Sequence, residues 1–148
     1  PPNVKSISVM VASNSPHIEE LKKKTSDFYT KLKLIIDCTT VAEIMAVSDL
    51  TIGGAGTTTY ERFTLGLPTL LVPMAENQLK GAKLIASTGA AINIGNYNKV
   101  SMERELTCFL ERNDLGKILA DTSAVASSIC DGGGTERVAS ELLKYGRH

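Results

Sequence analysis

The sequence has no tryptophan, only two histidines and only three cysteines in 148 residues. The cysteines, Cys38, Cys108 and Cys130, are widely spaced, and none belongs to a C-x-x-C pair. We therefore expect reduced thiols, as in a cytoplasmic protein, and no disulfide framework. Because His17 and His148 are the only imidazoles, a zinc site or a histidine-dependent triad is not easily assembled, and we expect no metal.

An excess of charge of one sign and a long hydrophobic run are also missing. Sixteen basic residues balance sixteen acidic residues, so nothing indicates nucleic acid or an anionic membrane as a partner. No apolar run is long enough to cross a bilayer, and we expect no signal peptide. We therefore expect a cytoplasmic protein with no membrane span and no nucleic acid, whose partner is a small molecule.

Short apolar segments alternate with helical patterns as far as Gly95. The predicted strands are residues 7–12, 34–37, 49–53, 69–72 and 91–94, and the predicted helices between them are residues 18–32, 41–47, 58–65 and 77–88. Thr40 and Glu43 form a T-x-x-E pattern that predicts a capping box before helix 41–47. Three further helices are predicted at residues 101–112, 114–128 and 135–145. This order predicts one α/β domain over residues 1–148, a Rossmann-like parallel sheet of about five strands with helices on both faces.

The stretch SDLTIGGAGTTTYE, residues 48–61, predicts a strand that ends in a glycine-rich turn and continues as a helix. Such a turn exposes backbone amides at a helix N-terminus, an arrangement that binds anions. The hydroxyls of residues 57–59 suit a diphosphate, and the carboxylate of Glu61 suits a ribose diol. A tight turn, a helix cap and a first-turn charge explain the same residues. The residues alone leave both interpretations open.

Two common nucleotide motifs do not fit this turn. A Walker loop needs a lysine after its last glycine, and none follows Gly56. In the G-x-G-x-x-G fingerprint, Gly54 and Gly56 fit, but Thr59 stands in place of the third glycine. We therefore expect neither a Walker-type ATPase or kinase nor a nicotinamide enzyme, and we expect no cofactor.

The block DLTIGGAGTTTYERFTLGLPTLLVPMAENQ, residues 49–78, resembles the nucleotide-binding half of GT-B-type UDP-sugar enzymes. It is most similar to the UDP-sugar hydrolases of pseudaminic acid biosynthesis, and more distantly to the N-acetylglucosaminyltransferase that completes the lipid-linked peptidoglycan precursor. Three other stretches support the resemblance, namely SVMVASNSPHIEEL, TTVAEIMAVSDL and CDGGGTERVASELL. The resemblance implies that the chain is the C-terminal half of a GT-B fold and binds a UDP-sugar.

The resemblance also implies roles for the matching positions. It places the ribose on Glu61 and the uracil beside Val41, where a loop enters helix 41–47. Glu76, Asn77 and Gln78 match a position that faces the sugar, with Asn77 as the catalytic polar group that helps to place the sugar or a water. The residues implied to lie under the diphosphate are Gly54, Ala55, Gly56, Thr57 and Thr58.

The implied activity is the release of UDP from a diacetamido-trideoxy hexose, in pseudaminic acid-type or surface polysaccharide biosynthesis. Two alternatives stay open, namely the donor-binding domain of a GT-B glycosyltransferase and a non-catalytic nucleotide-binding module. The family's N-terminal domain, with its catalytic histidine, and the strand–helix unit that normally begins its C-terminal domain have no counterpart in the sequence. We therefore expect this chain alone to be inactive without the missing N-terminal domain.

Overall fold

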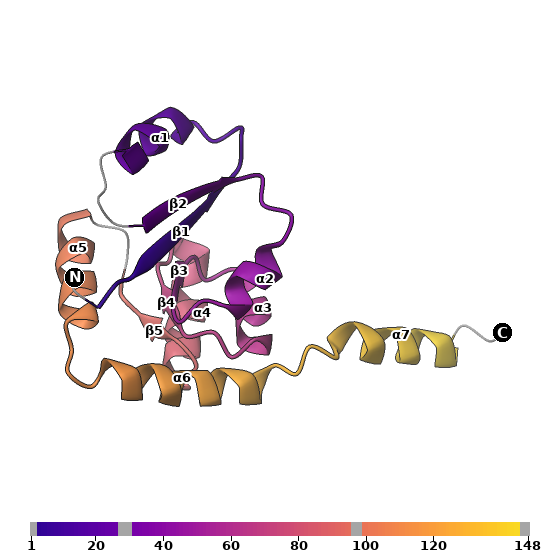
Figure 1. Ribbon diagram of the computed structural model, residues 1–148. Coiled ribbons are helices and arrows are strands. Elements are labelled where there is room, and N and C mark those ends of the chain that lie inside the picture. Colours follow the sequence, from indigo (N-terminus) through magenta and orange to yellow (C-terminus); the bar gives the residue numbers. More distant parts are fainter. Residues whose placement is uncertain (1–2, 27–30, 96–98, 146–148) are drawn as a thin grey trace.

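The computed structural model describes residues 3–26, 31–95 and 99–145 (Figure 1). Its strands are β1 (Ser6–Val11), β2 (Lys31–Ile36), β3 (Thr51–Gly53), β4 (Thr69–Leu71) and β5 (Ile92–Asn93). Its helices are α1 (Ile18–Ser26), α2 (Val41–Ala46), α3 (Thr58–Thr64), α4 (Glu76–Ser87), α5 (Lys99–Leu110), α6 (Leu115–Ile129) and α7 (Gly134–Tyr145). Strand and helix alternate as far as β5 and helices follow, which confirms the predicted α/β fold.

The strands form two parallel sheets instead of one. β1 pairs with β2, with Ser6 opposite Lys31, and a second sheet has the order β3-β4-β5, with Gly53 opposite Leu71. The prediction of a single sheet of about five strands is therefore wrong, because the larger sheet has three. Among the described residues, β1 and β2 do not pair with β3, β4 or β5.

β4 is the buried centre of the three-stranded sheet, and its residues alternate between two hydrophobic clusters. Leu71 belongs to one cluster with Phe63 of α3 and Ala82 of α4, against which α6 also packs. Leu70 and Val72 belong to the other, which α5 covers. Successive side chains of a strand point to opposite faces, so this sheet has helices on both faces, as predicted.

Two local predictions are wrong. The helix predicted over residues 18–32 ends at Ser26, and Lys31–Ile36 is β2 instead. The alternation of lysine and leucine in KLKLII has the period of a strand, which explains the difference. Thr40 makes no side-chain cap bond at the start of α2, so the predicted capping box does not form. Its φ of −116° and ψ of 45° depart from the extended backbone of an N-cap.

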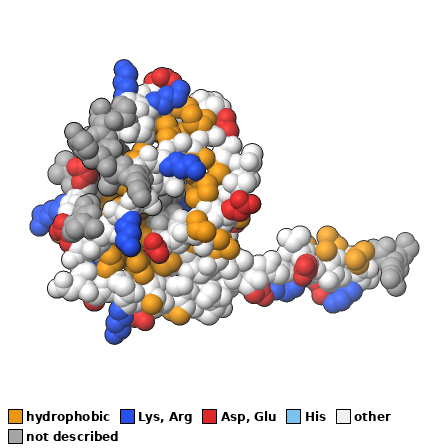
Figure 2. All heavy atoms as spheres, in the orientation of Figure 1, with side chains coloured by type: hydrophobic (Ala, Val, Ile, Leu, Met, Phe, Trp, Pro, Cys, Tyr) orange, Lys and Arg blue, Asp and Glu red, His pale blue; other side chains and the backbone are white. Residues whose placement is uncertain are grey.

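Helix α7 extends away from the body of the molecule (Figure 1). All of its residues are exposed, and Figure 2 shows hydrophobic side chains on its surface. Val138, Leu142, Leu143 and Tyr145 are 61% to 79% exposed. α7 therefore contributes nothing to the two hydrophobic clusters. Within the described residues, no helix combines the length and the hydropathy that a membrane span requires.

Candidate functional site

The glycine turn lies at the carboxyl end of β3, beside the loop that follows β4. The Val72 N–H donates to the Gly53 carbonyl at 2.9 Å, which holds the two strand ends together. A Cβ on Gly54 would lie 3.7 Å from Gln78 Oε1 and 3.8 Å from Met74 Cγ. The structure therefore brings the predicted diphosphate residues next to Gln78, one of the predicted sugar-facing residues.

The backbone amides of this turn are free of protein acceptors. In the described part of the chain, the N–H groups of residues 54–58 donate to no backbone or side-chain acceptor. The next amides begin α3, since Thr59 N–H donates to Gly56 and Tyr60 N–H donates to Thr57. Ala55 packs its methyl group against the cluster around Phe63, so it offers a ligand only its amide. The predicted diphosphate residues coincide with this run of available amides.

Gly54 and Gly56 are not required to be glycine by the fold. Neither has a φ in the left-handed region. A Cβ on Gly56 would meet nothing within 4 Å, and a Cβ on Gly54 would make only ordinary contacts. Glycine is also used where a ligand approaches the backbone closely. These two positions therefore favour a ligand site over a turn that merely needs glycine.

The three threonines after the turn do not share one role. Thr59 is fully buried, and its Oγ1 donates inward to the Gly54 carbonyl at 3.4 Å. The prediction that the hydroxyls of residues 57–59 all suit a diphosphate is therefore wrong for Thr59. Thr57 is exposed and makes no side-chain cap bond, and Thr58 is half-buried. The three threonines differ in exposure because Thr59 lies on the face of α3 that packs against the protein interior.

A buried arginine lies beneath the turn. Arg62 is 8% exposed, its Nη1 donates to the Gly54 carbonyl at 3.3 Å, and its Nε has no partner. Burial lowers the pKa of Arg62 because it disfavours the charged form, and the nearby Glu61 carboxylate partly opposes this effect. The sequence does not single out Arg62. Its spacing of three from Thr59 is the signal that places both side chains on one face of α3.

The remaining predicted residues lie around the turn in different settings. Glu61 is exposed on α3, and Glu76 and Asn77 are exposed at the first two positions of α4. Gln78 Oε1 accepts a hydrogen bond from the Met74 N–H at 3.1 Å, which braces the loop after β4. Val41, predicted beside the uracil, is the half-buried first residue of α2.

A second pair of loops meets at the carboxyl ends of β1 and β2. The Ser13 N–H donates to Asp37 Oδ1 at 2.8 Å, and Asp37 has a positive φ of 49°. The hydrogen bonds from Ser13 hold the pKa of Asp37 below its usual value. One hydrogen bond therefore joins the loop after β1 to the loop after β2, and another joins the end of β3 to the residue after β4.

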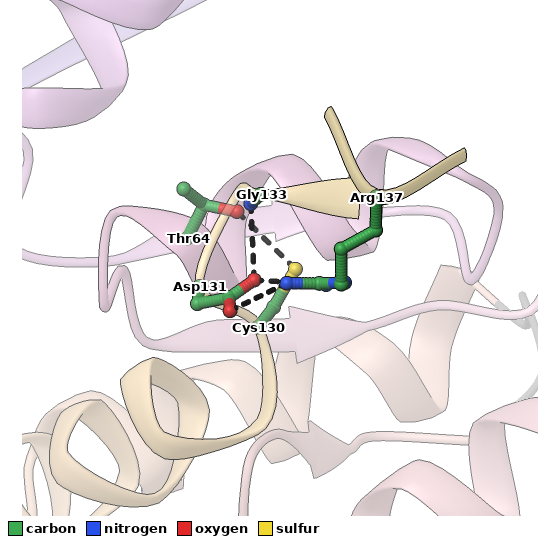
Figure 3. A network of polar contacts seen from close by, with 5 residues as sticks. All are labelled: Thr64, Cys130, Asp131, Gly133 and Arg137. Atoms are coloured by element: carbon green, nitrogen blue, oxygen red, sulfur yellow. Dashed lines mark hydrogen bonds and ion pairs between the residues drawn. The ribbon is translucent and has the colours of Figure 1, made fainter. Parts of the chain in front are cut away.

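In the glycine-rich segment after α6, the Asp131 carboxylate forms hydrogen bonds with Gly133 and with Arg137 of α7 (Figure 3). Asp131 accepts hydrogen bonds from both Arg137 Nη atoms, at 2.8 and 3.1 Å, and from the Gly133 N–H at 3.0 Å. The Arg137 contact, with that of Gly133, lowers the pKa of Asp131 to about 2. The Thr64 hydroxyl donates to Cys130 Sγ at 3.3 Å. This network connects the end of α3 to the junction of α6 and α7.

Comparison with known proteins gives one family match. The model of the glycosyltransferase family 28 C-terminal domain matches residues 5–113. The spore coat polysaccharide biosynthesis protein SpsG of Bacillus subtilis (strain 168) is 30% identical over 96 residues, which cover 64% of this chain and 28% of SpsG. The chain therefore spans less than a third of this relative.

Solved structures with a similar fold include an epimerase and two glycosyltransferases. A UDP-N-acetylglucosamine 2-epimerase has a TM-score of 0.62 at 18% identity, over 97% of this chain and 36% of the epimerase. The spinosyn forosaminyltransferase SpnP has a TM-score of 0.56 at 14% identity, over 93% of this chain and 34% of SpnP. The glycosyltransferase SsfS6 of Streptomyces sp. SF2575, complexed with thymidine diphosphate, has a TM-score of 0.53 at 12% identity, over 83% of this chain and 37% of SsfS6. These similarities show a fold shared with GT-B enzymes.

Proposed function

Because the chain belongs to the glycosyltransferase family 28 C-terminal domains, we propose that it binds the UDP moiety of a sugar nucleotide in a polysaccharide-forming pathway. The observation that carries the proposal is the run of available amides at residues 54–58, which lies at the carboxyl end of a parallel strand. Ligands of open α/β sheets bind at this edge. Backbone amides are suitable donors to phosphate oxygens.

In the proposed complex the diphosphate lies over residues 54–58, and the Thr57 and Thr58 hydroxyls add donors. The exposed carboxylate of Glu61 accepts hydrogen bonds from both ribose hydroxyls. The uracil lies beside Val41 at the start of α2. Glu76, Asn77 and Gln78 face the sugar in this proposal, and a Cβ on Gly54 would lie 3.7 Å from Gln78 Oε1.

The proposed reaction is hydrolysis of a UDP-linked diacetamido-trideoxy hexose. Water forms the new bond to the anomeric carbon, the bond to the diphosphate oxygen breaks, and UDP leaves. The amides of the turn stabilise the charge that develops on the leaving diphosphate, and Asn77 orients the sugar or the water. The remaining wall of the site belongs to polypeptide outside residues 1–148, and without it we expect no enzymatic turnover.

Two other functions use the same nucleotide site. The family match favours transfer of the sugar to an alcohol acceptor, for which this chain would be the donor-binding domain. A non-catalytic nucleotide-binding module would retain the glycine turn and Glu61 but would have no use for Asn77. Product analysis with the complete protein separates hydrolysis from transfer, and loss of turnover in an Asn77 variant excludes the module.

The test of the proposal is Glu61→Gln, followed by calorimetric titration with UDP and with inorganic pyrophosphate. Hydrogen bonds to a charged group are worth roughly 1.5–3 kcal/mol each, and glutamine retains one acceptor oxygen. Loss of one such bond should weaken UDP binding by about tenfold to a hundredfold. Pyrophosphate affinity should stay unchanged or improve slightly, because a negative charge leaves the site. Glu111→Gln, which removes an exposed charge from the turn after α5, is the matched control.

Each outcome of this titration has a definite meaning. A wild-type chain that binds neither UDP nor pyrophosphate contradicts the proposed function. An unchanged UDP affinity in a well-folded Glu61→Gln variant would contradict the assignment of the ribose to Glu61. An NMR amide titration with UDP, ADP and NAD in parallel then identifies the base, and a preference for ADP or NAD would contradict the uridine assignment.

A further inference from the structure

Among the residues whose side chains the structure describes, Arg62 is the one charged residue that is buried. Its Nη1 donates to the Gly54 carbonyl, and its Nε donates to nothing. The ion pairs of the described residues join other side chains, so no carboxylate lies within ion-pair distance of this guanidinium. Burying a charge without an ion-pair partner is unfavourable, and neither the fold nor the roles assigned above account for it.

The guanidinium lies directly against the backbone at the end of β3. A Cβ on Gly53 would lie 2.3 Å from Arg62 Nη2 and 2.8 Å from Cζ. Real Cβ atoms do not approach other atoms so closely, so position 53 must lack a side chain while the guanidinium stays there. The absence of a side chain at Gly53 thus makes room for a cation under the turn.

The contacts of the Gly54 carbonyl fix the orientation of one peptide unit. This carbonyl accepts hydrogen bonds from Thr59 Oγ1 at 3.4 Å and from Arg62 Nη1 at 3.3 Å, so it is turned toward the interior. The described peptide bonds are trans, and in a planar trans peptide the C=O and N–H of one unit point in opposite directions. The N–H of Ala55 is therefore turned away from Arg62, toward the outer side of the turn.

Resting on the proposed function, we propose that Arg62 is the positioning residue of the diphosphate site. It holds the Ala55 amide outward, toward a phosphate oxygen, and places a fixed positive charge on the inner side of the same turn. The charge interacts with the diphosphate through the protein interior, where screening by salt and water is weaker than at the surface. Arg62 does not touch the ligand, so it selects for ligand charge without making a direct contact.

A structural role alone does not explain an arginine at this position. Well-packed apolar side chains that replace buried charges are often neutral or stabilising. A guanidinium adds what an apolar side chain lacks, namely a planar set of donors and a charge that persists at all relevant pH values. The ligand expected from this chemistry is a nucleoside diphosphate, with the uncharged nucleoside unaffected by Arg62.

The experiment compares UDP and uridine binding to the full chain, measured by NMR titration, for wild type, Arg62→Met and Arg62→Lys. Arg62→Met should weaken UDP binding by at least about tenfold, which is about 1.4 kcal/mol, and should leave uridine binding unchanged in a protein that remains folded. Arg62→Lys retains the charge and should recover most of the UDP affinity. Arg112→Met removes an equal charge from an exposed side chain and should have no effect on UDP.

Three outcomes would overturn the proposal. They are an unchanged UDP affinity in folded Arg62→Met, a parallel loss of UDP and uridine binding, and a failure of Arg62→Lys to recover any affinity. Absence of UDP binding in the wild type would instead be a failure of the proposed function. If Arg62→Met does not fold, the Nε–H resonance of wild-type Arg62 decides. It should shift with UDP and pyrophosphate but not with uridine, and a resonance that does not move overturns the proposal.

Discussion

Gly53→Ala tests the packing beneath the glycine turn, because the added methyl group would collide with a buried guanidinium. The new Cβ would lie 2.3 Å from Arg62 Nη2 and 2.8 Å from Nη1. The guanidinium has little room to move, since the side chain is only 8% exposed. Relief of the collision requires it to leave its place and give up its hydrogen bond to the Gly54 carbonyl, 3.3 Å long in the native chain.

The expected loss of stability follows from three contributions. Overpacking a buried site costs about 1–3 kcal/mol, and a lost hydrogen bond from a charged donor adds up to about 1.5–3 kcal/mol. Alanine restricts the unfolded chain more than glycine does, which stabilises the folded state by about 0.4–1 kcal/mol. Because the native hydrogen bond is long, we expect a net loss of about 2 kcal/mol. In a chain of this size that loss lowers the melting temperature by about 4–8 °C.

A double-mutant cycle with Arg62→Met, measured by urea unfolding, isolates the collision. Methionine ends before the atoms that the new methyl group would meet, so Gly53→Ala should cost less than about 0.5 kcal/mol in that background. The coupling energy should then be about 1.5 kcal/mol, whereas independent sites add within about 0.3–0.5 kcal/mol. Gly56→Ala is the control, because its Cβ would meet nothing within 4 Å. An additive cycle, or a Gly53→Ala variant as stable as Gly56→Ala, would refute the reasoning.

Two further predictions concern the sugar side of the site and the α6–α7 junction. In the complete enzyme, Asn77→Ala should lower kcat more than it weakens UDP binding, because we expect Asn77 to face the sugar. An equal loss of UDP affinity in calorimetry would show that Asn77 contacts the nucleotide instead. Asp131 has a folded-state pKa of about 2, below its ordinary 3.8, so its contribution to stability is complete above pH 4 and is lost as the pH falls through about 2. The NMR titration of its carboxyl carbon should show that midpoint in the wild type and a higher one in Arg137→Met, still below 3.8 because the Gly133 N–H remains; a wild-type midpoint near 3.8 would contradict the ion pair.

The sequence predicts the order of the elements and the place of the glycine turn, because both depend on local patterns. Apolar periodicity indicates strand or helix over a few residues, and the glycine run at residues 53–56 indicates the break between them. Strand pairing is different, because it depends on contacts between distant residues. The alternation of elements is the same for one sheet as for two, so the separation of β1 and β2 from β3, β4 and β5 could not be predicted from it.

Within the candidate site, the sequence predicts which residues form the turn but not which way they face. Thr57, Thr58 and Thr59 are identical in the sequence, and only the rotation of α3 shows that Thr59 points inward. In the sequence, nothing distinguishes Arg62 from an exposed basic residue in the last turn of a short helix. Its burial depends on the space left at Gly53, nine positions earlier, and on the fold that brings the two together.

Stability is distributed unevenly along this chain, as a consequence of the separation into two sheets. None of the described residues before Met45 is buried, whereas all three residues of β4 are fully buried. We therefore expect the β1–α1–β2 unit to open without exposing either hydrophobic cluster, so that its amides exchange with solvent through local unfolding. We expect the amides of β4 to exchange only when both clusters unfold. The Ser13–Asp37 loops would then lie in the less protected part of the molecule, and the glycine turn would be supported by the more protected part.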